Sequence, residues 1–272
     1  MRRSGVVVAV AVALIAAVLG RGTARASEPL VLVYGDSIVY EAQPYAEQLL
    51  RDVGHVDYRV MGTAGAATCD WLPGMRADAA HSHPAAVVIG FFGNAFSPCM
   101  QDAAGKPVQG EEWLARYRAA SLQVLSIFNA PDTTVWFATG PISKWADDAH
   151  DPWPARFVAM LQGVAATSPR AHVVDSAASV LSNGHFVRWL PCLASEPCEG
   201  GVDTWGRPVN IVRNVFDNTH FCPAPFPKLD RCPIYASGAM RFAGGMLIPV
   251  LQSMGRFDAQ RAAWSYWATW PG

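Results

Sequence analysis

The chain has 272 residues, with 21 basic and 22 acidic side chains and a formal net charge of −1. It contains no block of like charge, which argues against a nucleic-acid-binding protein or a protein held by an anionic membrane surface. Hydrophobic residues make up 51% of the chain, which is enough to bury one large core.

The N-terminus has the three parts of a secretory signal peptide. Two arginines give a basic start, an uncharged apolar run follows at residues 5–20, and Ala24-Arg25-Ala26 has the small-x-small pattern of a cleavage site. We therefore expect residues 1–26 to be removed and residues 27–272 to form a single domain, secreted or held in the cell envelope. The alternative is an uncleaved anchor, but about 16 apolar residues fall short of the ~20 that span a bilayer. No second long apolar run exists, so we expect no integral membrane segment after cleavage.

Five short apolar runs alternate with helical stretches along the mature chain. The runs are typical of strands buried on both faces, and they comprise residues 30–34, 56–61, 85–91, 134–138 and 171–174. Helices are expected at residues 37 to about 53, 111–129, 154–166 and 235–251, and residues 176–228 show no regular pattern. Strands that alternate with helices form right-handed crossovers. The sequence therefore predicts an α/β fold, a three-layer α/β/α sandwich with a mostly parallel sheet of about five strands.

Ser37, Gly65 and Asn94 each lie just after the end of one of the first three predicted strands. In an open parallel sheet, active groups gather at the carboxyl ends of the strands. We therefore expect the three residues to share one edge of the sheet.

Ser37 follows a tight Gly-Asp turn and opens a predicted helix. A serine hydroxyl becomes a nucleophile only when a base within hydrogen-bond reach removes its proton. The candidate base is His220, because Asp217 stands three residues before it and can hold the imidazole in the tautomer that base catalysis needs. The structural alternatives are a helix N-cap for Ser37 and a surface turn for the other two residues.

An oxyanion hole is the second candidate feature at this edge. Acyl transfer develops a negative oxygen that donors must meet in a fixed place, and the Ser37 N–H, the Gly65 N–H and the Asn94 amide are suited to that task. Glycine fits a loop that approaches a substrate closely. Taken one at a time, the glycine and the asparagine also fit ordinary turns.

Together, four segments resemble the four-block pattern of the SGNH/GDSL hydrolase superfamily: VYGDSI at 33–38, GTAG at 62–65, GFFGN at 90–94 and DNTH at 217–220. The resemblance implies the flavodoxin-like fold of that family. It also implies Ser37 as nucleophile, Asp217 and His220 as the activating pair, and Ser37, Gly65 and Asn94 as the oxyanion hole. The chain departs from many members at Ala95, where they carry a supporting aspartate. The context of the blocks is similar to an exported, disulfide-containing actinobacterial branch.

The mature part contains an even number of cysteines: Cys69, Cys99, Cys192, Cys198, Cys222 and Cys232. In an exported chain this indicates disulfides, and the simplest of many possible pairings joins the cysteines in sequence order. A zinc site is the alternative, but no Cys-x-x-Cys pair supports it and no metal is expected. The family resemblance places Cys69 and Cys99 beside the second and third blocks, where a bridge would brace the oxyanion loops.

The leading hypothesis is a secreted serine ester hydrolase, of carboxylesterase or lipase type, that works through a Ser-His-Asp triad and an acyl-enzyme. It requires no cofactor, and we expect a monomer that acts on a small-molecule, lipid or acylated-glycan ester. One alternative keeps the site but makes the protein an O-acyltransferase or O-acetyl-esterase of cell-envelope glycans. The other is a non-catalytic binding protein on the same fold. Trp264, Trp267 and Trp270 are expected to pack the C-terminus against the core, or else to form an apolar surface.

Overall fold

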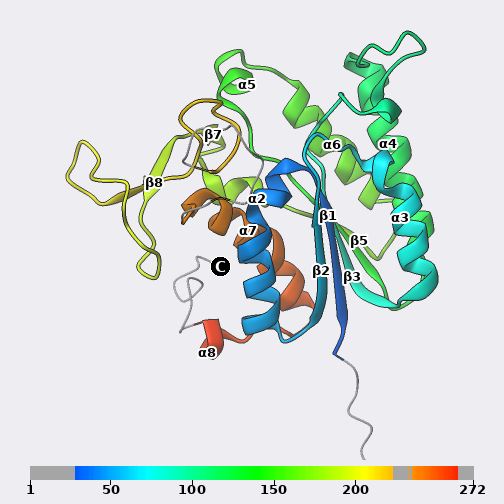
Figure 1. The fold of residues 1–272 in the computed structure, drawn as a ribbon, viewed down its shortest axis with the longest axis horizontal. Coiled ribbons are helices and arrows are strands. Elements are labelled where there is room, and N and C mark those ends of the chain that lie inside the picture. The colour runs from blue at the N-terminus through cyan, green and yellow to red at the C-terminus, as the bar shows by residue number, and fades with distance from the viewer. Residues whose placement is uncertain (1–27, 223–231, 233–234, 263–272) are drawn as a thin grey trace, which may run out of the picture.

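The computed structural model describes residues 28–222, 232 and 235–262, so the expected signal peptide and the three C-terminal tryptophans lie outside the described residues. Its central sheet has five strands in the order β2-β1-β3-β4-β5, and all neighbouring pairs are parallel (Figure 1). The strands are β1 (Leu30–Gly35), β2 (Asp57–Gly62), β3 (Pro84–Gly90), β4 (Thr134–Ala138) and β5 (Ala171–Val174). The predicted five-stranded parallel sheet is confirmed.

Strand β1 is apolar without interruption because both of its faces are buried. Val31 and Val33 belong to the core on one face of the sheet, whereas Leu32 and Tyr34 belong to the core on the other. All four are fully buried, because successive side chains of a strand point to opposite faces and β1 is covered on both.

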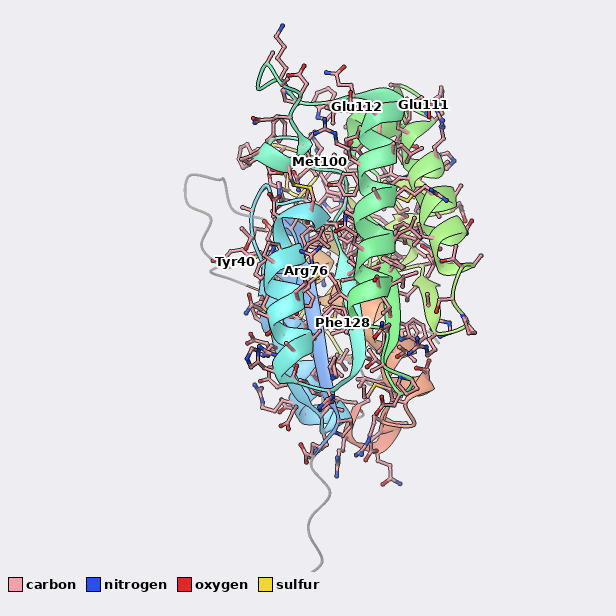
Figure 2. The ribbon with its side chains drawn as sticks, turned by 90° about the vertical axis from the view of Figure 1, so that its right-hand side faces the viewer. Tyr40, Arg76, Met100, Glu111, Glu112 and Phe128 are labelled. Atoms are coloured by element: carbon pink, nitrogen blue, oxygen red, sulfur yellow. A yellow bond between two sulfur atoms is a disulfide. The ribbon has the colours of Figure 1, made fainter. Side chains whose placement is uncertain are left out.

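Helices cover both faces of the sheet, which confirms the three-layer α/β/α arrangement (Figure 1). One layer contains α2 (Ser37–Gln48), the π-helical turn η1 (Leu49–Gly54) that continues it, and α7 (Ser237–Ser253). The opposite layer contains α3 (Thr68–His81), α4 (Gly110–Ile127) and α6 (Trp153–Ala165). Figure 2 looks onto this second layer, where Met100 and Phe128 are labelled beside α4. None of the described helices combines the length and the apolar character that a membrane crossing requires.

Helix α3 was not predicted from the sequence. Pro73 and Gly74 lie within it, and both residue types usually mark a turn, which obscures the helical pattern. The expected irregular segment 176–228 also contains regular pieces. These are the single helical turn η3 (Ala177–Val180) and two antiparallel ribbons, β6 (Leu181–Ser182) with β7 (His185–Phe186) and β8 (Trp189–Pro191) with β9 (Val209–Ile211). Strands of two or three residues are too short to show an alternating pattern in sequence.

Three further short helices complete the described structure: η2 (Pro98–Met100), α5 (Lys144–Asp148) and α8 (Ala259–Ala262). Helix η2 follows the loop that leaves β3, and α5 follows β4. Both therefore start from the carboxyl edge of the sheet, where the candidate site lies.

Candidate active site

A row of glycines at the carboxyl edge of the sheet allows α2 to pack directly onto it. Gly35 is in register with Gly62 on one side and with Gly90 on the other. A Cβ atom on Gly35 would lie 2.2 Å from a methyl group of Val39, and one on Gly62 would lie 2.4 Å from the backbone nitrogen of Tyr40. Only glycine leaves room for the helix here, and the helix begins with Ser37.

Ser37 is the first residue of α2, and it does not cap that helix. Asp36 is the N-cap, and its Oδ1 accepts the N–H of Ile38 at 3.0 Å. The capping role considered for the serine therefore belongs to its neighbour. The Ser37 hydroxyl instead lies 2.8 Å from Nε2 of His220.

A second hydrogen bond joins the imidazole of His220 to the carboxylate of Asp217. His220 Nδ1 lies 2.9 Å from Asp217 Oδ2, while Asp217 Oδ1 accepts the backbone N–H groups of Thr219 at 2.8 Å and of His220 at 2.9 Å. The backbone N–H groups of the turn thus fix the Asp217 carboxylate, and the carboxylate fixes the imidazole ring of His220. The structure brings the three residues into one hydrogen-bonded series, Ser37–His220–Asp217.

The charges of the site favour a protonated imidazole. Burial by itself lowers the pKa of His220, but the hydrogen bond with Asp217 and the negative charges of Glu41, Asp217 and Asp36 outweigh it and raise the pKa above its ordinary value. Burial raises the pKa of Asp217, yet the His220 side chain and the N–H donors of the turn bring it below its ordinary value. This arrangement stabilises an imidazolium that has taken a proton from a serine.

A buried asparagine, Asn214, supports the histidine loop from inside. Its Oδ1 accepts the N–H groups of Phe216 at 2.8 Å and Asp217 at 3.2 Å, and its Nδ2 donates to the carbonyl of Cys222 at 2.7 Å. Its backbone N–H also donates to the His220 carbonyl at 2.6 Å. Sequence reasoning missed this residue, because an asparagine three residues before an aspartate looks like any other turn residue.

The second and third loops meet next to Asp36. Asn94 Nδ2 lies 3.1 Å from Asp36 Oδ2 and 3.1 Å from the carbonyl oxygen of Ala66, the residue after Gly65. The same carboxylate oxygen accepts the N–H of Phe92 at 2.8 Å. The structure therefore brings the Gly65 loop and Asn94 to the turn that carries Ser37, as the strand-end positions predicted.

Gly65 has φ +73°, a left-handed conformation that favours glycine, and no heavy atom lies within 4 Å of the place where its Cβ would be. Among the described residues, none accepts a hydrogen bond from the Gly65 N–H or from the Ser37 N–H. Both backbone donors are thus available to a ligand. The amide of Asn94, by contrast, already has two acceptors within reach.

Asp36 is a buried acid that the sequence did not single out. Burial raises its pKa to about 7, although the N–H donors of Phe92 and Ile38 and the charge of His220 favour the carboxylate. With two donors on one oxygen and one on the other, it joins the serine turn to the loop that carries Asn94.

The three disulfides join the cysteines in sequence order, so the simplest pairing is confirmed. The bridge between Cys69 and Cys99 links the first turn of α3, which follows the Gly65 loop, to η2, which follows Asn94. The bridge between Cys222 and Cys232 starts two residues after His220. Two of the three bridges therefore brace loops of the candidate site.

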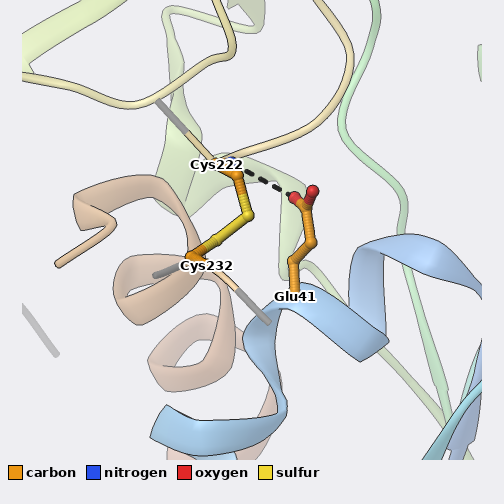
Figure 3. A group of neighbouring side chains, drawn as sticks. All are labelled: Glu41, Cys222 and Cys232. Carbon is orange, nitrogen blue, oxygen red and sulfur yellow. Dashed lines mark hydrogen bonds between the residues drawn. A yellow bond between two sulfur atoms is a disulfide. The ribbon is translucent and has the colours of Figure 1, made fainter. Parts of the chain in front are cut away.

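Within the described residues, one group has three potential metal ligands close together, namely Glu41, Cys222 and Cys232 (Figure 3). The two sulfur atoms are bonded to each other. A metal prefers thiolate sulfur, so this group does not form a metal centre while the disulfide is intact.

Fold and site together define an α/β protein with a Ser-His-Asp series at the carboxyl edge of a parallel sheet. No protein-family model and no curated protein sequence matches the chain. Among solved structures, it is similar to an acetylxylan esterase of Geobacillus stearothermophilus, crystallised as a catalytic mutant, with 16% identity over 82% of this chain and 94% of that one and a TM-score of 0.52.

Two other solved structures show the same likeness. A protein of Bacteroides fragilis described as an acylhydrolase matches with 16% identity over 85% of this chain and 92% of that one, at a TM-score of 0.51. A GDSL-like lipase of Bacteroides thetaiotaomicron matches with 12% identity over 83% of this chain and 88% of that one, at a TM-score of 0.50. The chain therefore has the SGNH/GDSL hydrolase fold, as its four segments predicted.

Proposed function

We propose that this protein is an exported serine hydrolase of carboxylic esters. The observation that carries the proposal is the hydrogen-bonded series from the Ser37 hydroxyl through His220 to Asp217, with 2.8 Å and 2.9 Å between the bonded atoms. A base in contact with a hydroxyl, itself oriented by a carboxylate, is the arrangement that activates a serine nucleophile.

In the proposed reaction, Ser37 Oγ attacks the ester carbonyl carbon while His220 Nε2 accepts the hydroxyl proton. The tetrahedral intermediate collapses as its carbon–oxygen bond to the alcohol breaks, and His220 gives the proton to the departing oxygen. Water then attacks the acyl-enzyme, with its proton passing to His220 and from there back to Ser37. The products are one acid and one alcohol.

The negative oxygen of the intermediate lies against the backbone N–H groups of Ser37 and Gly65 in this proposal. Both are free of acceptors among the described residues, and fixed donors of this kind supply much of the stabilisation in acyl transfer. The Asn94 amide is the third donor. To donate to the substrate oxygen, the amide gives up its hydrogen bond to the Ala66 carbonyl. It keeps its hydrogen bond to the Asp36 carboxylate.

Three disulfides support export, since such bridges persist in oxidising compartments. The lipase and acetylxylan esterase among the structural neighbours make lipid esters and acetylated glycans the two substrate classes to compare first. The proposal covers ester cleavage with either class.

The test uses the purified protein with nitrophenyl esters from acetyl to palmitoyl and with acetylated xylan. We expect turnover in the wild type and none above background in Ser37→Ala. Ser253→Ala, at the exposed end of α7, is the matched control and should keep full activity.

A fluorophosphonate should label the wild type at Ser37, as read by mass spectrometry of the labelled peptide. Activity retained in Ser37→Ala would overturn the proposal. Absence of both turnover and labelling in the wild type would indicate a binding protein on this fold.

A further inference from the structure

Glu41 is a buried carboxylate on the nucleophile helix. It lies one turn after Ser37 on α2, is only 3% exposed, and occupies the same buried face of the helix as Ile38 and Ala42. Burial of a carboxylate is costly unless hydrogen bonds compensate for the lost water. Its position therefore requires specific partners.

Those partners are the peptide groups that directly follow the candidate base. Glu41 Oε2 accepts the N–H of Phe221 at 2.6 Å and the N–H of Cys222 at 3.3 Å, and Figure 3 shows the second of these contacts beside the disulfide. The histidine loop thus touches α2 at two points. Its imidazole meets Ser37, and its backbone meets the residue one turn further along the same helix.

The surroundings of Glu41 connect it electrostatically to the candidate site. The guanidinium of Arg213, which is fully buried, lies 5.0 Å from the ring centre of Phe221. Burial lowers the pKa of Arg213 to about 9, and the charge of Glu41 acts against this change, so the arginine stays cationic at neutral pH. Burial has the largest effect on Glu41 and raises its pKa above the ordinary value, although the Phe221 and Cys222 N–H groups and the charge of His220 act in the opposite direction.

We propose that Glu41 is a positioning residue that fixes His220 relative to Ser37 by holding the two peptide N–H groups after the histidine, an inference that rests on the proposed function. Asn214 and the Cys222–Cys232 bridge already restrain the loop within itself. Within the described part of the chain, Glu41 attaches the loop backbone to the helix that carries the nucleophile through its bonds to Phe221 and Cys222. The rigid helical turn between Ser37 and Glu41 then sets the distance between the Ser37 hydroxyl and the His220 imidazole.

Electrostatics gives this role a signature that simple structural support lacks. The ionisable groups that act on His220 are Asp217, Glu41 and Asp36, and all three favour the imidazolium. Removing the charge of Glu41 therefore lowers the pKa of the base. The pH at which activity is half lost on the acid side should move to a lower value.

The experiment compares Glu41→Gln and Glu41→Ala with the wild type, using a nitrophenyl ester across pH. Glu41→Gln keeps an oxygen acceptor without the charge, and Glu41→Ala removes both. We expect kcat per fluorophosphonate-titrated site to fall severalfold in the first and by ~100-fold in the second, as for a misplaced catalytic group. KM should stay within about twofold, because the residue does not touch the substrate. In both variants the acid limb should shift to lower pH.

Glu47→Gln is the matched control, since Glu47 lies on the outer part of the same helix and bonds to Gln43; it should match the wild type. Variants that have a lowered Tm but the kcat and acid limb of the wild type would overturn the positioning role. If Glu41→Ala does not fold, Glu41→Gln decides alone. Ser37→Ala separates the two proposals, because its activity tests the nucleophile whatever Glu41 does.

Discussion

The carboxylate of Asp36 and the side-chain amide of Asn94 lie 3.1 Å apart, although 58 residues separate them in the chain. The same aspartate caps the helix that begins with Ser37. The residue before the candidate nucleophile therefore also orients a candidate oxyanion donor. Any change at Asp36 should affect both.

We expect Asp36→Asn to lower kcat by at least tenfold and the free energy of unfolding by about 1–3 kcal/mol, the usual cost of a buried unpaired polar group. The new amide group would place a donor where Oδ2 accepts from Phe92 and Asn94. Ester kinetics and urea unfolding measure the two effects. Asp52→Asn, on the exposed side of η1, should change neither. A kcat equal to that of the wild type would contradict the orienting role.

Activity should rise with pH through a midpoint above about 6.5, the ordinary pKa of histidine. The base works as the neutral imidazole, and the pKa of His220 is raised in the folded protein, so protons block it up to a higher pH than usual. Asp36, with a pKa of about 7, titrates in the same range and should steepen the acid limb. Replacing Asp217 with Asn should reduce kcat by roughly 10⁴-fold and shift the limb to lower pH. A profile of kcat/KM against pH that is flat between pH 5 and 8 would contradict this assignment.

The bridge between Cys69 and Cys99 should matter more for stability than the bridge between Cys192 and Cys198. The first closes a separation of 30 residues and the second one of 6, and loop-closure entropy favours the longer loop by about 1.4 kcal/mol. Paired Cys→Ser variants compared by urea unfolding test the order. The first pair should also lower kcat, because it braces the Gly65 and Asn94 loops, whereas the second pair leaves kcat unchanged. An inverted order would show that loop entropy does not dominate.

Two exposed aromatic rings stand beside the site. Phe96 is 74% exposed and follows Asn94 by two residues, and Phe216 is 64% exposed and precedes Asp217. Covering such a ring with substrate removes apolar surface from water, worth about 1 kcal/mol. We therefore expect Phe96→Ala and Phe216→Ala to raise KM about fivefold for esters of longer acids, with kcat within about twofold. Trp205, which is 77% exposed in the loop between β8 and β9, provides the control. If Trp205→Ala raised KM as much as Phe96→Ala and Phe216→Ala do, the effect on KM would not be specific to the two rings beside the site, and the prediction would be contradicted.

The positions of Ser37, Gly65 and Asn94 were predictable because an apolar run that ends at a small or polar residue marks the carboxyl end of a buried strand. Because the strands pair in parallel, their carboxyl ends lie at the same edge of the sheet, so no further information is needed to predict that the three residues lie near one another. The disulfide pairing was predictable only as the simplest choice, since sequence says nothing about the distances between cysteines.

The supporting acids were missed for a physical reason. Asp36 and Glu41 are carboxylates, which are expected at the surface, yet both are buried and accept backbone N–H groups from distant loops. Glu41 alone left a trace in the sequence, because it falls on the apolar stripe of its helix beside Ile38. The turn at Asn218, with φ +55°, determines how Asp217 reaches its histidine, and sequence spacing cannot supply that geometry.

The direction of β1 has a consequence for how the protein would be presented to its surroundings. This central strand starts at Leu30 and ends at Gly35, next to the candidate nucleophile. Six residues of strand span about 20 Å, so Glu28 and Pro29, which precede β1, lie at the edge of the sheet opposite the candidate site. For the same reason, an N-terminal purification tag should leave access to Ser37 open.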